Sequence, residues 1–358
     1  MAMRVLIVDD SAFFRKALKE VLTADGFLEV VGEAVNGREA IDKAARLEPD
    51  VITMDVEMPV MDGISAVREI MKAKPTPILM LSALTQAGAE ATLDALDAGA
   101  VDFWPKDTTD PKSTLHQSAR LLRARLRTLA VRGVPRKARA PLVPPSASTA
   151  GKVERGSGLQ AGDLRGVISR RGMVVIGAST GGPAALQIVL ERIPAGFPVP
   201  VLIAQHMPAA FTGPFAQRLD AISGLKISEA VDGEPLLPGH AYVIPGGVHG
   251  EVIRQQGQCA FRRREPAANE HYRPSVSIAL ASAAMVYGAD TLGVVLTGMG
   301  DDGAQGARMV RDSGGHVWSQ DQASCVIYGM PAAVAKAGLS EAVLPLGQIG
   351  DAIAGCVR

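Results

Sequence analysis

Two series of short apolar runs alternate with amphipathic segments, and this alternation restricts the fold more than any other feature of the chain. The first series covers about residues 4–130, and the second opens with the apolar run at residues 173–176. Strands that alternate with helices form βα units, which build parallel sheets covered by helices. We therefore predict an α/β protein with two doubly wound domains.

The first series contains five predicted βα units and forms an N-terminal (βα)5 domain, which we assign to residues 1–131. Amphipathic segments such as 13–22 and 90–98 predict helices between the strands. The apolar runs that predict strands lie at residues 5–8, 30–34, 51–54, 78–81 and 101–103.

The composition changes between the two series. Residues 132–171 are rich in Pro, Ser, Gly and Arg and have no apolar period, which is typical of a linker. Residues 172–358 form the second predicted domain, a mostly parallel α/β sheet. Short strand signals at 242–244 and 252–254 predict an antiparallel edge for it.

Charge and hydropathy restrict the partners of the chain. The 37 basic residues balance 37 acidic residues, so no overall field attracts nucleic acid or anionic lipid. No apolar run approaches the roughly 20 residues of a spanning helix, and the first residues do not resemble a signal peptide. We expect a cytoplasmic protein that neither binds nucleic acid nor inserts into a membrane.

Three aspartates are predicted to meet at one edge of the first sheet. Asp9 and Asp10 end the first strand and Asp55 ends the third, and parallel strands place their carboxyl ends at the same edge. Crowded carboxylates repel one another unless a hard divalent cation joins them, and oxygen ligands favour Mg2+ over Zn2+. We therefore predict a Mg2+ site at these three residues.

Two further side chains are expected at this edge. Ser82 ends the fourth strand and Lys106 follows the fifth. A carboxylate nucleophile, a metal ion and a lysine together suit phosphoryl transfer to Asp55. An isolated Asp-Asp pair is usually solvated or caps a helix. The interpretation as a phosphoryl-transfer site therefore depends on the complete set of three aspartates, Ser82 and Lys106.

A glycine-rich turn provides a candidate nucleophile in the second domain. Residues 177–181, Gly-Ala-Ser-Thr-Gly, follow an apolar strand and precede a helical segment, which is the context of a nucleophile elbow. Ser179 would project at a helix N-terminus whose free amides, including that of Thr180, can hold an oxyanion. The same turn is also compatible with phosphate or dinucleotide binding, and catalysis is the favoured interpretation.

The base and the acid that a serine nucleophile requires follow two other strands. His206 is the only histidine directly after a long apolar strand, and Asp301 and Asp302 follow another. Ser179, His206 and one of these aspartates would then converge on one sheet edge. Spacing alone does not choose between Asp301 and Asp302.

The first domain resembles a response-regulator receiver domain over roughly its first 125 residues. The resemblance implies that Asp55 accepts a phosphoryl group from a chemotaxis histidine kinase, and that Asp9 and Asp10 hold Mg2+. It also implies that Lys106 pairs with the phosphate and that Ser82 and Phe103 form the switch. The motifs that carry it are Val8-Asp9-Asp10-Ser11, Met54-Asp55-Val56-Glu57-Met58-Pro59, Met61-Asp62-Gly63, Ser82 and Lys106.

One residue departs from the receiver pattern. Receivers usually have proline directly after the lysine, whereas Pro105 precedes Lys106 in this chain. We still expect the Lys106 ammonium to reach the acidic edge.

Residues from about 172 to 347 resemble the CheB-type chemotaxis methylesterase domain. The resemblance implies Ser179 as nucleophile, His206 as base and Asp302 as the acid that orients it, with Thr180 and Met299 beside the oxyanion. The segments that carry it are 177–183, Gln205-His206-Met207, Arg273-Pro274-Ser275-Val276 and 297–303.

The two resemblances together imply a phosphorylation-activated hydrolase. It would remove γ-methyl esters from glutamates on the cytoplasmic helices of chemoreceptors and so provide adaptation in chemotaxis, with no cofactor in the catalytic domain. Some members of the family also deamidate receptor glutamines. We expect the unphosphorylated receiver to pack over the edge that holds Ser179, and a phosphate on Asp55 to shift it away.

Two other classes of function stay open from the sequence. One is a phosphorylation-controlled binding module with an inactive hydrolase domain, and the other is a receiver coupled to nucleotide binding at the glycine turn. Substitution of Ser179 by Ala separates the first class from an esterase, because a binding module would keep its affinity.

Overall fold

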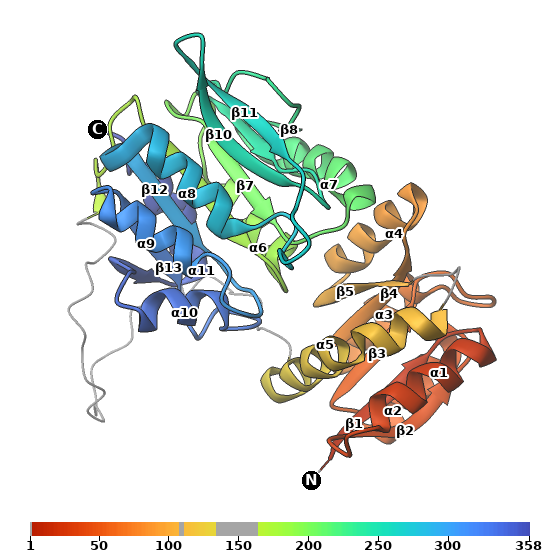
Figure 1. The fold of residues 1–358 in the computed structure, drawn as a ribbon. Helices are drawn as coiled ribbons and strands as arrows, with labels where there is room; N and C mark the ends of the chain where they lie inside the picture. Colours follow the sequence, from red (N-terminus) through yellow and green to blue (C-terminus); the bar gives the residue numbers. More distant parts are fainter. Residues whose placement is uncertain (1, 107–110, 134–163) are drawn as a thin grey trace.

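The computed structural model describes residues 2–106, 111–133 and 164–358, which form two α/β domains (Figure 1). The first domain is coloured from red to yellow and the second from green to blue. Residues 134–163 of the predicted linker lie outside the described residues. Helix α4 of the first domain lies beside α7 of the second, so the two domains contact each other through helices.

The first domain is built on a five-stranded parallel sheet with the strand order β2-β1-β3-β4-β5. Its strands are β1 (Met3–Val8), β2 (Leu28–Ala34), β3 (Val51–Asp55), β4 (Ile78–Ala83) and β5 (Asp102–Lys106). Its helices are α1 (Ala12–Thr23), α2 (Gly37–Leu47), α3 (Gly63–Ala73), α4 (Gln86–Asp97) and α5 (Pro111–Arg132). The predicted (βα)5 domain is confirmed.

Alternation along β1 shows which helices cover which face of this sheet. Val5 and Ile7 point into a cluster shared with α1 and α5, whereas Leu6 and Val8 point into a cluster shared with α2, α3 and α4. Both faces are buried, which explains why β1 is an uninterrupted apolar run in the sequence.

The second domain is built on a seven-stranded sheet with the order β14-β13-β12-β6-β7-β9-β8, and every pairing in it is parallel. Its strands are β6 (Met173–Ala178), β7 (Val201–Gln205), β8 (Lys226–Glu229), β9 (His240–Val243), β12 (Thr291–Val295), β13 (His316–Gln320) and β14 (Ala342–Leu344). Its helices are α6 (Gly182–Leu190), α7 (Ala209–Ile222), α8 (Val276–Tyr287), α9 (Ala304–Asp312), α10 (Met330–Lys336) and α11 (Leu346–Ala354), with the short 3-10 helix η2 (Gly288–Asp290).

The antiparallel part of this domain is the hairpin of β10 (His249–Gln255) and β11 (Gln258–Arg264), which forms a two-stranded sheet of its own. The predicted fold class, two doubly wound α/β domains with an antiparallel component in the second, is confirmed. The strand signal at 242–244 belongs to β9, which pairs in parallel with β7 and β8.

The chain already packs on the second domain before β6 begins. Ile168 is fully buried and pairs with Val357 near the C-terminus, and Leu164 belongs to the same apolar cluster. The domain boundaries at residues 131/132 and 171/172 stay predictions. Residues from 164 onward pack with the second domain.

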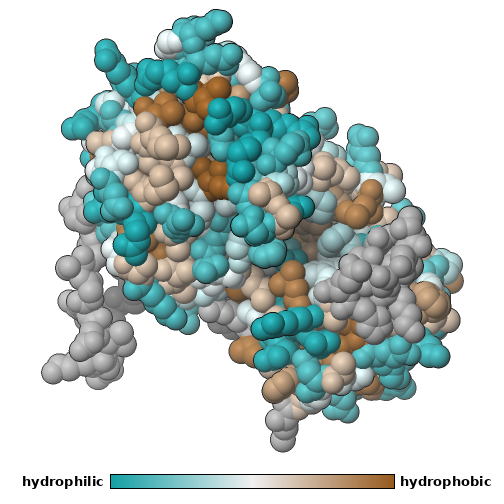
Figure 2. Space-filling model, viewed as in Figure 1, coloured by the Kyte–Doolittle hydropathy of each residue, from teal (hydrophilic) through white to brown (hydrophobic). Residues whose placement is uncertain are grey.

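The surface shows no single dominant apolar face in the view of Figure 2, where hydrophilic and apolar residues are interspersed over both domains. Among the described residues, no helix combines the length and the apolar character needed to cross a bilayer.

Gly177 lies in the central strand β6, and a Cβ atom there would lie 2.2 Å from Cγ1 of Val276 in α8. We predict that Gly177→Ala lowers the free energy of unfolding of the second domain by about 1–3 kcal/mol, because Val276 is fully buried and cannot move aside without disturbing its packing. Gly347→Ala is the matched control, since a Cβ at Gly347 meets nothing within 4 Å. Urea unfolding of both variants measures the difference, and equal stabilities would contradict the packing argument.

Candidate active site and phosphorylation site

Three adjacent strands bring the predicted serine, histidine and aspartate to one edge of the seven-stranded sheet. β6 lies between β7 and β12, and Ser179, His206 and Asp302 follow the carboxyl ends of β6, β7 and β12. The carboxyl edge of an open parallel sheet is the usual location of ligand and catalytic sites.

His206 is held by Asp302. The His206 Nε2 atom lies 2.8 Å from Oδ2 of Asp302, whose carboxylate also accepts hydrogen bonds from the amides of Val276 and Ser277 and from the Ser275 hydroxyl. Burial alone would raise the pKa of Asp302, but the bond to His206 and these amides lower it to about 2. Asp302 is therefore a fixed negative charge beside the imidazole.

The neighbouring Asp301 has a different environment. It is exposed and lies 3.3 Å from the hydroxyl of Tyr272, and the Tyr272 ring stacks on the His206 ring with 5.0 Å between centroids. The geometry therefore distinguishes the two aspartates that spacing left open. Asp302 contacts the imidazole directly, and Asp301 contacts the aromatic ring that covers it.

The turn that carries Ser179 is tied to its two neighbouring strands. The Ser179 amide donates to the Thr297 carbonyl at 3.0 Å, and the Thr297 hydroxyl donates to the Thr180 carbonyl at 2.9 Å. Nε2 of Gln205 donates to the carbonyls of both Ser179 and His206. Gln205 and Thr297 therefore fix the backbone on both sides of the nucleophile position, a role that sequence reasoning did not assign to them.

The amides of Thr180 and Met299, predicted to lie beside the oxyanion, are uncommitted among the residues that the structure describes. Within the described part of the chain, the N–H groups of Thr180 and Met299 donate to no acceptor. Nδ1 of His206 and Oγ of Ser179 likewise have no hydrogen-bond partner among the described residues. The structure thus leaves the Ser179 hydroxyl, one ring nitrogen of His206 and the amides of Thr180 and Met299 uncommitted at one edge.

A buried histidine that sequence reasoning did not include supports this arrangement from behind. His249 is fully buried; its Nδ1 accepts from the Ser275 amide at 3.1 Å, and its Nε2 lies 3.1 Å from Oε2 of Glu270. Burial lowers the pKa of His249, so the ring is neutral and Nε2 carries the proton. This contact positions Ser275, whose hydroxyl binds Asp302.

The receiver site has the predicted carboxylates. Oxygen atoms of Asp9, Asp10 and Asp55 lie within 4.8 Å of one another, and Nζ of Lys106 lies 2.7 Å from Asp9 and 2.6 Å from Asp55. Burial and the charge of Asp55 raise the pKa of Asp9 to about 6, against the bond from Lys106. Such carboxylate crowding fits a hard divalent cation.

The departure from the receiver pattern at Pro105 does not prevent the Lys106 ammonium from reaching the acidic edge, since it contacts both Asp9 and Asp55.

The other two predicted receiver residues face α4 and the second domain. The Ser82 hydroxyl donates to the Gly88 carbonyl at 3.0 Å and accepts from the Thr92 hydroxyl at 2.6 Å. Phe103 stacks on Phe211 of α7, with 4.6 Å between ring centroids and an angle of 11° between the planes. Ser82 is therefore bound to the same helix, α4, that contacts α7.

The receiver also lies beside the nucleophile turn. Burial raises the pKa of Asp102 in β5. The Arg125 guanidinium and the nearby Thr180 side chain both oppose this rise. The Asp102 Oδ2 and Thr180 Oγ1 atoms are both buried, and neither has a hydrogen-bond partner among the described residues. Ser179 itself is 5% exposed in this arrangement.

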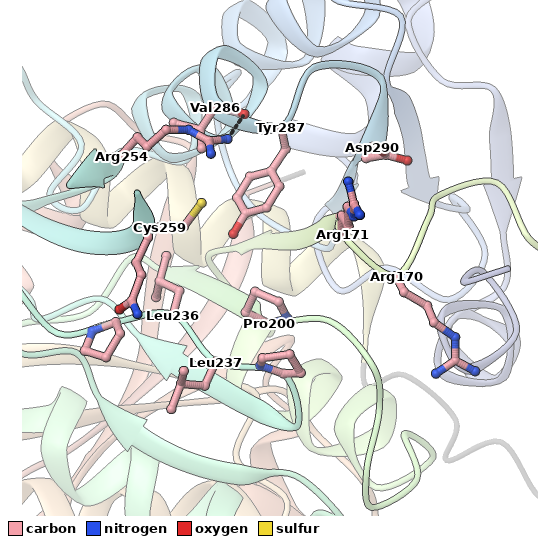
Figure 3. A pocket seen from close by; sticks show the side chains of 14 residues that line it. Arg170, Arg171, Pro200, Leu236, Leu237, Arg254, Cys259, Val286, Tyr287 and Asp290 are labelled. Atoms are coloured by element: carbon pink, nitrogen blue, oxygen red, sulfur yellow. Dashed lines mark hydrogen bonds between the residues drawn. The ribbon is translucent and has the colours of Figure 1, made fainter. Parts of the chain in front are cut away.

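A separate cavity lies at the opposite edge of the second domain (Figure 3). Gly172, Pro200 and Asp290 line it. Each of them directly precedes a strand of the sheet, β6, β7 and β12 respectively. Figure 3 shows the Tyr287 ring in this cavity and Arg254 hydrogen-bonded to the Val286 carbonyl. No residue of the Ser179 site lines this cavity.

Comparison with known proteins matches both halves of the chain. Residues 174–353 match the CheB methylesterase family, and residues 5–119 match the response regulator receiver domain. The chain belongs to the CheB methylesterase family. Its relatives in this family include a protein-glutamate methylesterase/protein-glutamine glutaminase of Alkalilimnicola ehrlichii, 47% identical with 99% of each chain covered.

Other members of the family agree in length and fold. A protein of the same description from Vibrio parahaemolyticus is 46% identical, with 98% of each chain covered. The crystal structure of the CheB methylesterase catalytic domain of Thermotoga maritima is 40% identical and covers 51% of this chain and 97% of that chain, with a TM-score of 0.50. The fold of the second domain is therefore that of a CheB catalytic domain.

The low pKa of Asp302 predicts a pH dependence of stability. Because its folded-state pKa, about 2, lies below the ordinary value of 3.8, the group stabilises the fold above pH 3.8 and loses this contribution as the pH falls toward 2. Between pH 5 and pH 2 we expect the free energy of unfolding of Asp302→Asn to fall by about 2 kcal/mol less than that of the wild type. Urea unfolding at pH 2 to 5 measures it, and Asp301→Asn is the matched control. Equal pH slopes for wild type and Asp302→Asn would contradict the assignment.

Proposed function

We propose that this chain is a protein-glutamate methylesterase, with glutamine deamidation as a second activity, controlled by phosphorylation of its receiver domain. The convergence of Ser179, His206 and Asp302 on one edge, beside the free amides of Thr180 and Met299, is the observation that carries the proposal. We assign residues 1–131 to the receiver, 132–171 to the linker and 172–358 to the catalytic domain.

The proposed reaction is a two-step acyl transfer. Nδ1 of His206 takes the proton of the Ser179 hydroxyl, and Oγ attacks the carbonyl carbon of a glutamate γ-methyl ester. The amides of Thr180 and Met299 bind the oxyanion, and protonated His206 returns its proton to the methoxy oxygen as the C–O bond breaks and methanol leaves.

The second step regenerates the enzyme. His206 takes a proton from water, whose oxygen attacks the acyl carbon, and the collapse of the second tetrahedral intermediate releases glutamate and returns a proton to Ser179. Asp302 keeps the proton of the imidazole on Nε2, which leaves Nδ1 free as the base throughout. With a glutamine side chain the same steps release ammonia in place of methanol.

The receiver would supply the control signal. Asp55 is the proposed phosphoryl acceptor, a chemotaxis histidine kinase the proposed donor, and the cytoplasmic helices of a methylated chemoreceptor the proposed substrate. Asp9, Asp10 and Asp55 would hold Mg2+, which offsets the charge of the incoming phosphoryl group. Lys106, already bonded to Asp9 and Asp55, would pair with the phosphate.

The interdomain contacts support a covering role for the unphosphorylated receiver. Phe103 stacks on Phe211, which lies five residues after His206, and Asp102 lies against Thr180 beside the nucleophile. Ser82 and Phe103 are the proposed switch. A phosphate on Asp55 would attract the Ser82 hydroxyl away from Gly88 and Thr92, and α4 would then lose the bonds that hold it in its present position.

Methanol release from methylated receptor membranes tests the function directly. We expect the full-length protein to release methanol, and to do so faster with a small phosphodonor and Mg2+. Ser179→Ala should abolish the release while binding of the membranes persists, because only the nucleophile is removed. Asp55→Asn should release methanol at the basal rate with or without phosphodonor. No release by the wild type would contradict the esterase proposal.

Loosening the interdomain contact tests the covering role separately. We predict that Phe103→Ala raises the unphosphorylated rate about tenfold, since loss of roughly 1.4 kcal/mol of stacking and burial favours the open arrangement by that factor. Deletion of residues 1–131 should raise the basal rate further. Phe27→Ala, a largely exposed receiver phenylalanine, is the matched control. An unchanged or lower rate for both altered proteins would contradict occlusion.

A further inference from the structure

The surface of the catalytic domain that α4 covers contains a cation whose only carboxylate partners belong to the receiver. Within the described residues, Arg218 of α7 pairs with Asp94 and Asp97 of α4 and with no acid of its own domain. Gln187 of α6 adds a hydrogen bond to Asp97 at 3.1 Å. When the receiver leaves, Arg218 and Gln187 lose these partners together.

Helix α4 carries acidic residues near its C-terminal end, where acidic residues are unfavourable. Glu90, Asp94 and Asp97 are exposed and spaced i, i+4, i+7, so they form one stripe along α4, and the helix contains no lysine or arginine. Asp94 and Asp97 lie in the last turns, where the helix dipole disfavours negative charge. Helix stability therefore does not explain Asp94 and Asp97, whereas pairing with Arg218 does.

The covered surface begins at the catalytic edge. α6 starts three residues after Ser179, and α7 starts three residues after His206. Arg218 lies nine residues after the first residue of α7, which at 1.5 Å per residue is about 14 Å along the helix from its start beside the site. A substrate helix with its ester at Ser179 would reach Arg218 with side chains two to three turns away.

The substrate side of the reaction has the complementary charge. Every turnover, of an ester or of an amide, leaves a glutamate carboxylate, so a protein with several such sites is acidic around the remaining ones. Asp94 and Asp97 are themselves about half exposed, and ion pairs of this kind are weak enough to exchange.

Resting on the proposed function, we infer that the α6–α7 surface is a docking site for an acidic helix of the substrate protein. Arg218 is its anchoring cation, and α4 of the receiver occupies the same surface as an internal substitute for that helix. Arg218 thus has two successive partners: the receiver carboxylates in the covered state, and substrate glutamates after release. Its role in the open enzyme is recognition, remote from the reacting atoms.

Two synthetic helical peptides test this inference in the full-length, phosphodonor-treated protein. Each carries one central glutamate γ-methyl ester; one has glutamates two to three turns away on both sides, and the other has alanines there. We expect the wild type to bind the glutamate-flanked peptide about fivefold more tightly, with a matching difference in KM and the same kcat. Arg218→Ala should bind both peptides equally.

Control variants separate recognition from release of the receiver. Arg192→Ala removes another surface arginine of the catalytic domain, one paired with Asp351, and should keep the fivefold preference. The double variant Asp94→Asn, Asp97→Asn breaks the same interdomain ion pairs and should also keep it. A preference retained by Arg218→Ala would overturn the inference, as would an absence of preference in the wild type. Binding is measured independently of methanol release, so an inactive wild type would refute the proposed function alone.

Discussion

The stack of Phe103 on Phe211 joins the receiver sheet to the helix that follows the candidate catalytic histidine, and in the proposed mechanism the two sites communicate through this contact. Phe103 lies in β5, next to β4, the strand that contains Ser82, and Phe211 lies in the first turn of α7. Because both rings are buried, neither domain can move here without exposing aromatic surface. The proposed control therefore depends on this contact.

The polar contacts around this stack have a different character. Arg218 with Asp94 and Asp97 forms a partly exposed set, which contributes orientation more than stability. Ser82, by contrast, is buried and bonded to α4 at two points. A charge placed on Asp55 would act on the buried bonds, and their loss would release the exposed ones. In the proposed mechanism the apolar stack holds the closed arrangement, and the hydroxyl network makes that arrangement sensitive to phosphate.

The fold and the principal site residues could be predicted because both follow from strand ends. Ser179, His206 and Asp302 each follow an apolar run, and parallel strands place such residues at one edge whatever the order of the strands. The choice between Asp301 and Asp302 could not be made in this way, because it depends on how the N-terminus of α8 directs the amides of Val276 and Ser277 to one carboxylate.

Other contributions come from residues without a recognisable spacing. His249 supports Ser275 from the start of a hairpin, and Tyr272 covers His206 from an irregular segment, so neither has a period or motif of its own. Arg218 is an ordinary surface arginine in the sequence of α7. Its partners lie more than a hundred residues earlier, in another domain, and only the docking of the two domains identifies them.

Amide hydrogen exchange of the full-length protein, with and without phosphodonor and Mg2+, tests the central claim most directly. The account predicts that phosphorylation increases exchange in α4 and in the first turns of α7 together, in the wild type and not in Asp55→Asn. Unchanged protection of both helices in the phosphorylated protein would contradict the coupling of the receiver to the Ser179 site.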